Sequence, residues 1–413
     1  MYSWYIISIT LEELKKNILR KHYEENLMKT NKYLVLFGAL TAQLTIAGLY
    51  AWSIFSAAIV HEHGWSDNQV LLTYSIAQFV FAFSTIFSGK LIDKKGPKIT
   101  LFIGALLYGG GLILSSFVTS PVMLIITYGV IMGAGVGFVY VCPLSTLIKW
   151  FPKNKGTITG LGVAVFGGGS IVFKEVIQAL LDAGTISSAF MYLGIISLVI
   201  ILLASLLVSL PEGYTKNDIV KTELDFTSKE MIKTSKFKKI WIMYWLAVIP
   251  GLLTLGAAKN IGLDNKMTAA AAAGLVTVLA LSNAGSRLMS GYLSDKFGTL
   301  RMLKVIFGVT ITSLLLISFF STVTPIFYMA IIGIAVGYGG FLSLFPTFTN
   351  QQFGSYRYGS NYGIVYQAYG LAALSGIFIK SIAGSYTNTF IISAIAGVIG
   401  LLIAFTIKER KTA

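Results

Sequence analysis

The chain has 413 residues, of which 55% are hydrophobic and only 12% are charged, and its mean hydropathy is +0.75. The charged share is about half of that in a soluble domain, so the composition excludes a soluble enzyme of this size and indicates many membrane spans. A net charge of +15 would also fit a nucleic-acid-binding protein, but the positions of the cations, described below, argue against that class. The single cysteine, Cys142, excludes an intramolecular disulfide and a cysteine-built metal site, and we expect neither a metal nor a cofactor.

The polar residues 1–32 are predicted to form a cytoplasmic arm. They contain no apolar core of the kind found in signal peptides, and their cations are Lys15, Lys16, Arg20 and Lys21. In the alternative interpretation the protein starts at Met28. The residues from Tyr23 onward would then be the translation, by mistake, of a purine-rich ribosome-binding site in the messenger RNA.

Twelve apolar segments follow, each long enough to cross a bilayer as a helix. We predict the first six at about 33–58, 68–88, 99–118, 121–148, 157–181 and 188–210. The second six are predicted at about 240–262, 268–293, 302–321, 325–349, 361–383 and 388–407. The fold is therefore expected to be an all-α membrane protein, with an N-terminal six-helix bundle at residues 33–210 and a C-terminal one at residues 240–407.

A polar linker at residues 211–239 separates the two sets, and residues 408–413 form a short tail; both are expected in the cytoplasm. The linker opens with Pro211-Glu-Gly. It also contains Thr227-Ser-Lys-Glu230, a capping box that predicts the start of a short surface helix.

Lysine and arginine residues gather in every second connection between the apolar segments. Besides the linker and the tail, these connections carry Lys90, Lys94, Lys95, Lys98, Lys149, Lys153, Lys155, Lys296, Arg301, Lys304 and Arg357. The intervening connections carry almost none, with Lys266 as the exception. Cations mark the cytoplasmic side of a membrane protein, so we expect both termini inside the cell and the protein in the plasma membrane. The net charge then reflects topology, and no nucleic-acid partner is expected.

The two halves contain the same motif at the same place. Gly89, Leu91, Asp93 and Gly96 follow the second segment, and Gly291, Leu293, Asp295 and Gly298 follow the eighth at a constant offset of 202 residues. Such a repeat implies a pseudo-two-fold axis along the membrane normal, with the binding site between the halves. The glycines would allow a tight turn between helices. The aspartates would accept hydrogen bonds from a neighbouring helix N-terminus and keep an inner gate closed.

The fourth and tenth segments are also paired. They contain Gly133-Ala-Gly-Val-Gly137 and Gly337-Tyr-Gly-Gly340, and in each a proline follows the glycines, Pro143 or Pro346. Glycine runs inside apolar segments are not nucleotide loops, because no strand precedes them. Small residues let helices pack closely, and a proline bends a membrane helix, so these segments suit gating elements.

Arg287 lies inside the eighth apolar segment, about two turns or roughly 12 Å before Asp295. A permanent cation at that depth is expensive and usually faces a cavity or a partner. Asn283 lies one turn earlier on the same helix face, and a guanidinium beside an amide suits a carboxylate. In the alternative, Arg287 reaches toward the cytoplasmic edge and Asn283 bridges two helices. We interpret Arg287 as the anchor of a small organic anion.

An ordered set of motifs supports this interpretation. The motifs are Gly48-Leu-Tyr50-Ala-Trp-Ser53, Gly133 to Tyr140, Trp150 to Gly156, Asn283 to Arg287, Ser294 to Gly298, Leu344-Phe-Pro346 and Asn361-Tyr-Gly363. Together they resemble the oxalate/formate antiporter family of the major facilitator superfamily, over about residues 33–407. The resemblance implies an anion site lined by Tyr50, Tyr140, Phe166, Tyr338, Leu342 and Tyr366. It also implies that the arginine of the eighth helix is the carboxylate anchor.

One position departs from the family pattern. Where the oxalate-handling members have a second cation, a lysine of the eleventh helix, this chain has Tyr369. A dianion held by Arg287 alone would leave one negative charge uncompensated in a low-dielectric site, at a cost of several kcal/mol. One cation with several tyrosine hydroxyls therefore favours a monoanion.

We predict a secondary transporter that moves a small monocarboxylate such as lactate, pyruvate or formate by alternating access, coupled to protons or by exchange. It is expected to work as a monomer in the lipid bilayer, without ATP and without enzymatic chemistry, since no phosphate-binding loop is present. The alternatives are a dicarboxylate:monocarboxylate antiporter, an efflux pump for hydrophobic drugs, and a sensor that binds an anion without moving it. Glu175 is a candidate for carrying a coupling proton, although its position toward the outer face favours an interfacial role.

Overall fold

The computed structural model describes residues 31–211 and 225–408, which are helical apart from short connections and contain no strand. The expected arm at 1–30 with Met28, most of the linker and the last five residues lie outside the described part. The first bundle consists of α2 (Lys32–Ile46), η1 (Ala47–Ala51), α3 (Trp52–His63), α4 (Asp67–Lys95), α5 (Pro97–Ser115), α6 (Pro121–Leu124), η2 (Ile125–Met132), α7 (Gly133–Trp150), α8 (Lys155–Asp182) and α9 (Ile186–Leu207).

The second bundle follows a short linker helix, α10 (Ser228–Lys233). It consists of α11 (Ser235–Asp264), α12 (Ala269–Phe297), α13 (Thr299–Phe320), α14 (Thr324–Phe353), α15 (Tyr358–Val365), α16 (Gln367–Ala383) and α17 (Tyr386–Phe405). Within the described ranges, eleven helical stretches are long and apolar enough to cross a membrane. The predicted eighth segment, α12, is not among these eleven, but its 29 residues exceed the roughly 20 that a bilayer requires. The all-α architecture with two bundles is thus confirmed.

Side-chain caps and glycines delimit several helices where the sequence indicates. Thr227 and Glu230 form both hydrogen bonds of the predicted capping box at the start of α10. Gly96 and Gly298, which separate α4 from α5 and α12 from α13, have φ angles of 87° and 90°. Only glycine adopts this backbone conformation without strain, so the two turn glycines have the role expected from the repeat.

Three predicted membrane helices depart from a regular α-helix: the fourth contains the π-helical stretch η2, and the first and eleventh are interrupted at a tyrosine that is predicted to line the site. The first contains the 3₁₀ stretch η1, which includes Tyr50, and the eleventh breaks at Tyr366 between α15 and α16. A 3₁₀ turn winds more tightly than an α-helix and often marks a functional position. The apolar pattern of the sequence does not reveal either interruption, because both stretches remain hydrophobic.

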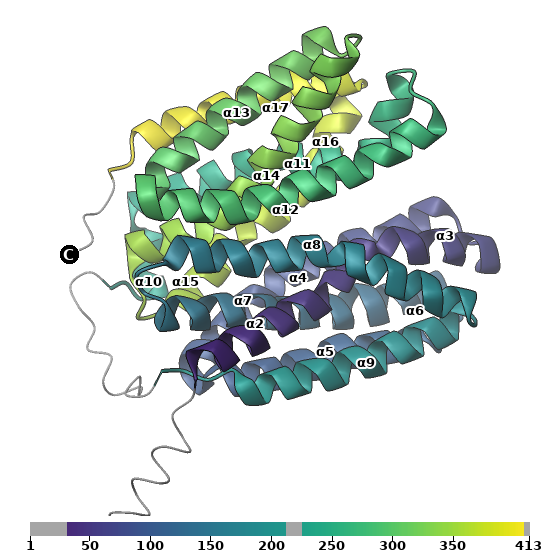
Figure 1. Ribbon diagram of the computed structural model, residues 1–413, viewed down its shortest axis with the longest axis horizontal. Coiled ribbons are helices and arrows are strands. Elements are labelled where there is room, and N and C mark those ends of the chain that lie inside the picture. The colour runs from purple at the N-terminus through teal and green to yellow at the C-terminus, as the bar shows by residue number, and fades with distance from the viewer. Residues whose placement is uncertain (1–30, 212–224, 409–413) are drawn as a thin grey trace, which may run out of the picture.

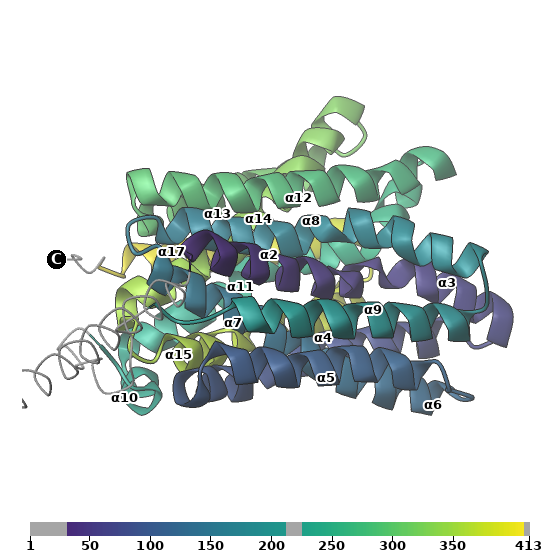
Figure 2. The ribbon, with the colours of Figure 1, turned by 60° about the horizontal axis from the view of Figure 1, so that its bottom comes forward.

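The two bundles pack against each other most closely at the end where α2 begins, α17 ends and α10 lies, which we call the linker end (Figure 1). Across the interface α8 packs on α12, α4 packs on α15 and α16, and α14 packs on α8. The second view shows the same helices running along the long axis of the molecule (Figure 2). Most buried apolar side chains of both bundles form one continuous core.

The bundles diverge toward the opposite end, where the ribbons of α8 and α12 separate (Figure 1). A second apolar core lies in that half of the C-terminal bundle, around Leu275, Leu314 and Phe327. Among the side chains that the structure describes, this core contains none from the N-terminal bundle. The described conformation is therefore closed at the linker end.

Two glycines of the repeat lie at the closest contacts between the bundles. A Cβ atom on Gly89 would collide with the carbonyl of Gly359 in α15, and one on Gly291 would collide with the carbonyl of Gly156 in α8. The sequence predicts a turn for all four repeat glycines. For Gly89 and Gly291 the structure gives a different reason, because both lie inside helices and allow two backbones to touch.

Candidate transport site and inner gate

Arg287 lies in the middle of the interface between the bundles and is only 1% exposed. Its Nε donates to Oδ1 of Asn283, one turn earlier in α12, at 3.1 Å. Its Nη1 donates to the backbone carbonyl of Val163, in α8 of the other bundle, at 2.6 Å. The guanidinium also lies 5.9 Å from the centre of the Tyr338 ring.

The third nitrogen of this guanidinium, Nη2, is buried and has no hydrogen-bond partner. Within the described ranges no carboxylate contacts Arg287. A buried cation without a counter-ion is unfavourable, and the guanidinium donors suit a planar carboxylate. The alternative, in which Arg287 reaches the cluster around Asp295, is not what the structure describes, since the side chain instead turns toward α8.

Gly167 of α8 makes room for this arrangement. A Cβ atom at this position would lie 2.6 Å from Nη1 and 2.7 Å from Cζ of Arg287. Those separations are shorter than any normal contact, so a larger residue would displace the guanidinium. Sequence reasoning missed Gly167 and Val163. The available signal was the row of small residues on one face of this helix, Gly156, Gly160 and Gly167, which is typical of a close helix contact.

The predicted aromatic residues come together around the arginine. In the N-terminal bundle the ring of Tyr50 lies 4.8 Å from that of Phe166, and Phe166 lies 5.2 Å from Tyr140. The Tyr50 hydroxyl interacts electrostatically with the Arg287 guanidinium, yet it is buried and forms no hydrogen bond of acceptable geometry. The Tyr50 hydroxyl thus lies beside the guanidinium, and neither this hydroxyl nor Nη2 has a hydrogen bond of good geometry in the described conformation.

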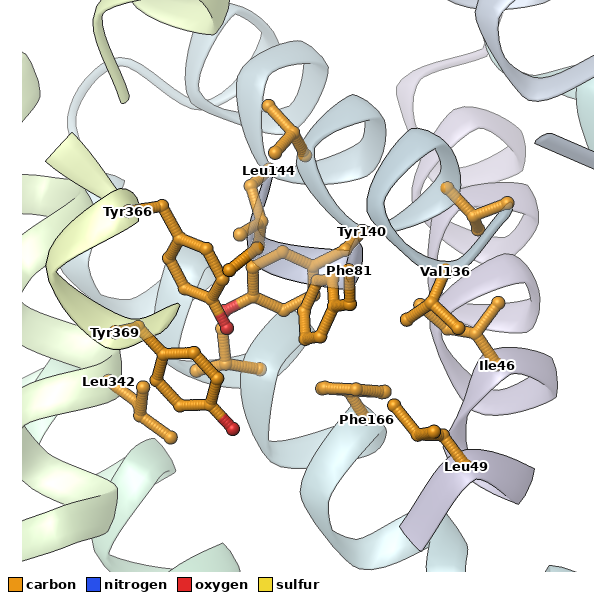
Figure 3. Close-up of a cluster of buried hydrophobic side chains, with 14 of the residues drawn as sticks. Ile46, Leu49, Phe81, Val136, Tyr140, Leu144, Phe166, Leu342, Tyr366 and Tyr369 are labelled. Atoms are coloured by element: carbon orange, nitrogen blue, oxygen red, sulfur yellow. The ribbon is translucent and has the colours of Figure 1, made fainter. Parts of the chain in front are cut away.

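The C-terminal bundle contributes the other predicted residues. The hydroxyls of Tyr338 and Tyr369 lie 3.3 Å apart, and the ring of Tyr369 stacks on that of Tyr366 at 4.9 Å. Tyr366 in turn lies 5.1 Å from Tyr140 of the other bundle. Figure 3 shows Leu342, Tyr366 and Tyr369 on one side of the interface, with Tyr140, Phe81 and Phe166 on the other.

Phe81 of α4 is a further member of this cluster that sequence reasoning missed. Its ring contacts four of the predicted residues, at 5.1 to 6.1 Å, namely Tyr140, Phe166, Tyr366 and Tyr369. Nothing in the sequence distinguishes it, because the same helix also has Phe79 and Phe83, which are exposed on its outer face.

At the linker end, each repeat aspartate caps a helix of the other bundle. Asp295 accepts from the backbone N–H of Gly156 at 2.9 Å and from that of Thr157 at 2.7 Å, and from the Thr157 hydroxyl at 2.6 Å. Asp93 accepts from the backbone N–H of Ser360 at 2.8 Å. Neither α8 nor α15 has a cap from its own side chains, so the aspartates satisfy N–H groups that would otherwise lack acceptors.

A third polar contact joins the bundles at the same end. The ammonium of Lys155, at the start of α8, donates to Oδ1 of Asn350 in α14 at 2.9 Å. The end of the linker lies beside it: Asp225 accepts from the backbone N–H of Tyr356 at 3.2 Å, and Phe226 pairs with the carbonyl of Phe353. Pro143 and Pro346 lie inside α7 and α14, both of which continue past the proline.

The comparisons with known proteins agree with this architecture. Residues 35–377 match the family model described as Major Facilitator Superfamily. The chain belongs to the major facilitator superfamily. It is therefore a membrane transporter that works by alternating access, and not an enzyme. Within the described ranges, no group of three or more histidine, cysteine, aspartate or glutamate residues could hold a metal.

Among relatives of this major facilitator protein is the oxalate:formate antiporter of Oxalobacter formigenes, which is 28% identical over 386 residues and 92% of each chain. The MFS-type transporter YhjX of Escherichia coli is also 28% identical, over 83% of this chain and 86% of its own. The fold is similar to that of the proton:xylose symporter XylE, with a TM-score of 0.74 and 13% identity over 91% of this chain and 95% of the symporter. The fold is also similar to that of the human organic anion transporter MFSD10, with a TM-score of 0.73 and 10% identity over 91% of this chain and 99% of that transporter.

Proposed function

We propose that this transporter carries a small organic monoanion of the lactate, pyruvate or formate class, with Arg287 as the carboxylate anchor. The observation that carries the proposal is the buried guanidinium, which has a free Nη2 and no carboxylate partner among the described residues. A substrate carboxylate would provide the missing counter-charge and accept from Nη2. The Tyr50 hydroxyl, which is also unpaired, would donate a second hydrogen bond.

Asn283 has a different part in this proposal from the one expected. Its Oδ1 already accepts from Nε of Arg287, so it orients the guanidinium through that hydrogen bond. The aromatic residues would enclose the rest of the substrate. The hydroxyls of Tyr338 and Tyr369 lie within hydrogen-bond distance of each other. Among the described residues that form this cluster, Arg287 is the one cation, which favours a monoanion over a dianion.

The relatives support the carboxylate class. The oxalate:formate antiporter of Oxalobacter formigenes is named for two carboxylates, and its identity with this chain extends over nearly the full length of both. That relationship also favours the second candidate function, exchange of a dicarboxylate for a monocarboxylate. The tyrosine at position 369 argues against the second candidate, for the charge reason given above.

The orientation follows from the cations. The linker end would face the cytoplasm in the plasma membrane, with both termini inside, because the lysine-rich connections gather there. Residues 33–210 and 240–407 would move as two bodies within one monomer, and the described conformation would admit substrate from the outside. Binding would neutralise Arg287 and so favour the rearrangement that opens the linker end. Transport of the anion would be coupled either to a proton or to the exchange of a second anion.

Uptake of labelled lactate, pyruvate and formate into proteoliposomes, with and without a pH gradient, tests the proposal. The wild type should accumulate at least one of these acids, and Arg287→Ala should lose the saturable uptake. Arg301→Ala is the matched control, since Arg301 is exposed at the start of α13. Equal uptake by Arg287→Ala and the wild type would remove the anchor, and resistance to hydrophobic drugs without uptake of any acid would favour the efflux alternative.

A further inference from the structure

A row of four tyrosines leads from the inner gate to the candidate site. Tyr358, Tyr362, Tyr366 and Tyr369 lie on α15, on α16 and at the break between them, and their rings are 5.7, 5.6 and 4.9 Å apart in sequence order. The row begins next to Ser360, which donates to Asp93, and ends at Tyr369 beside Tyr338. It therefore spans the closed half of the interface between the bundles.

Some hydroxyls near this row have no partner. The hydroxyls of Tyr358 and Tyr362 are buried without a hydrogen bond, and so is that of Tyr244 in α11, whose ring lies 6.2 Å from Tyr366. All three residues are at most 1% exposed. A buried hydroxyl without a partner destabilises the conformation that contains it, whereas phenylalanine would give the same ring packing without that penalty.

These hydroxyls face the other bundle. Tyr140 of α7 contacts the ring of Tyr366 at 5.1 Å, and its hydroxyl interacts electrostatically with those of Tyr244 and Tyr362. The Tyr362 hydroxyl lies close enough to those of Tyr140 and Tyr244 to interact with both, but neither contact has the geometry of a full hydrogen bond. Separation of the bundles at the linker end would carry Tyr140 away with its own bundle and would leave these hydroxyls lining the passage between Arg287 and the linker end.

We propose that Tyr244, Tyr358 and Tyr362 form a second, transient binding site for the carboxylate on the linker side of Arg287. This inference rests on the proposed function, because it concerns the same monoanion as it moves from Arg287 toward the linker end. Phenol hydroxyls donate hydrogen bonds to a carboxylate but supply no counter-charge, so the site binds more weakly than Arg287. A weak second site lets the anion leave Arg287 in steps. The tyrosine hydroxyls donate hydrogen bonds in place of some of the water molecules that the carboxylate lost on binding.

The test compares the triple variant Tyr244→Phe, Tyr358→Phe, Tyr362→Phe with the wild type, in proteoliposomes of known orientation. Saturable transport of the labelled monocarboxylate is measured from each side, together with thermal stability in detergent. The matched control is Tyr192→Phe, since Tyr192 is 57% exposed on α9. The three single variants are measured in parallel, in case the triple variant does not fold.

The expected result separates function from stability. The half-saturation concentration from the linker side should rise by roughly ten-fold or more, the factor for losing a hydrogen bond to a charged group, and that from the opposite side should stay unchanged. Thermal stability should be equal or higher, because unpaired hydroxyls have been removed. An unchanged half-saturation concentration on the linker side would mean that the hydroxyls only bind water in the open state, and the proposal would be overturned.

The variant could also weaken linker-side binding by keeping the gate closed. A cysteine at position 85, in a Cys142→Ser background, reports gate opening, because Thr85 contacts the Gly363 carbonyl across the interface. Labelling of that cysteine at the wild-type rate supports the second site, and a fall in labelling that matches the loss of affinity overturns it. Failure of the proposed function is recognised separately, by wild-type transport that does not depend on Arg287.

Discussion

Arg287 on α12 and Val163 on α8 are joined by a 2.6 Å hydrogen bond between a side chain of one bundle and the backbone of the other. Arg287, the proposed substrate anchor, therefore lies in one bundle and contacts the other in the described conformation. Any movement that separates α8 from α12 at this depth breaks that bond. In the proposed function a bound carboxylate would replace that acceptor, which would link substrate binding to the conformational change.

Replacing Gly167 with alanine should disturb the site without removing any charge. The new Cβ would lie 2.6 Å from Nη1 of Arg287, so the guanidinium must move and lose its bond to Val163. We expect monocarboxylate transport to fall at least ten-fold, because a hydrogen bond to a charged group contributes about 1.5–3 kcal/mol. Gly168→Ala is the control, as its Cβ would meet only the Ala284 side chain at 3.5 Å. Similar uptake by both variants would contradict the described geometry.

Replacing Tyr369 with lysine should change the preferred charge of the substrate. The ammonium would lie in the cluster with Tyr338 and Tyr366 and provide the second cation that a dianion requires. We expect oxalate uptake to rise at least ten-fold and monocarboxylate uptake to fall. Tyr369→Phe keeps the ring and controls for the hydroxyl. If wild type and Tyr369→Lys take up oxalate equally well, the protein is a dicarboxylate exchanger and the monoanion assignment is wrong.

Asp295→Asn should loosen the inner gate. Asp295 accepts three hydrogen bonds at the start of α8, whereas Asp93 accepts one backbone hydrogen bond at the start of α15. Because Asp295 is exposed, the loss of its charge at a helix N-terminus is expected to be worth about 0.3–1 kcal/mol. Labelling of a cysteine at position 85 should therefore rise roughly two- to five-fold. A variant that labels more slowly than the parent would contradict the gate assignment.

Gly291→Ala should separate the bundles at the linker end by collision. The added Cβ would meet the Gly156 carbonyl, and overpacking of this kind costs about 1–3 kcal/mol. The conformation open at the linker end should gain population, again measured by labelling at position 85. Gly285→Ala on the same helix is the control, since its Cβ would meet nothing within 4 Å. Equal labelling in the two variants would show that the close contact does not hold the gate.

The sequence predicts the fold because apolar run length and cation placement are local properties. The repeat offset also identifies Asp93 and Asp295 as partners of helix N-termini, and both contacts are present. Depth in the apolar run marks Arg287, whose environment lacks a carboxylate among the described residues. What the sequence cannot predict is which residue of one bundle meets which residue of the other. Gly167, Val163 and Phe81 have ordinary neighbours in sequence, and their importance depends on the packing of α4, α8 and α12.

Asn283 illustrates how spacing in the sequence can predict a shared helix face without predicting the contact made there. Its spacing from Arg287 predicts a shared helix face, and the two side chains do share it. The amide oxygen, however, is already used by the arginine. Substitution of Asn283 is expected to disturb the orientation of Arg287, while the amide Nδ2 of Asn283 is still available to donate to a carboxylate.

The unequal capping of the two helices at the linker end has a consequence for the order of events. At the linker end itself, the contact of α4 with α15 has one hydrogen bond, from Ser360 to Asp93, and a second lies about two turns deeper, from Thr85 to the Gly363 carbonyl; the contact of α8 with α12 has three at the linker end. The contact of α4 with α15, which has fewer hydrogen bonds at the linker end, should separate first. The contact of α8 with α12 should then act as the pivot of the movement. The cytoplasmic passage would then form asymmetrically, beginning on the α4 side, so a transported acid would leave past the tyrosine-bearing wall of α15.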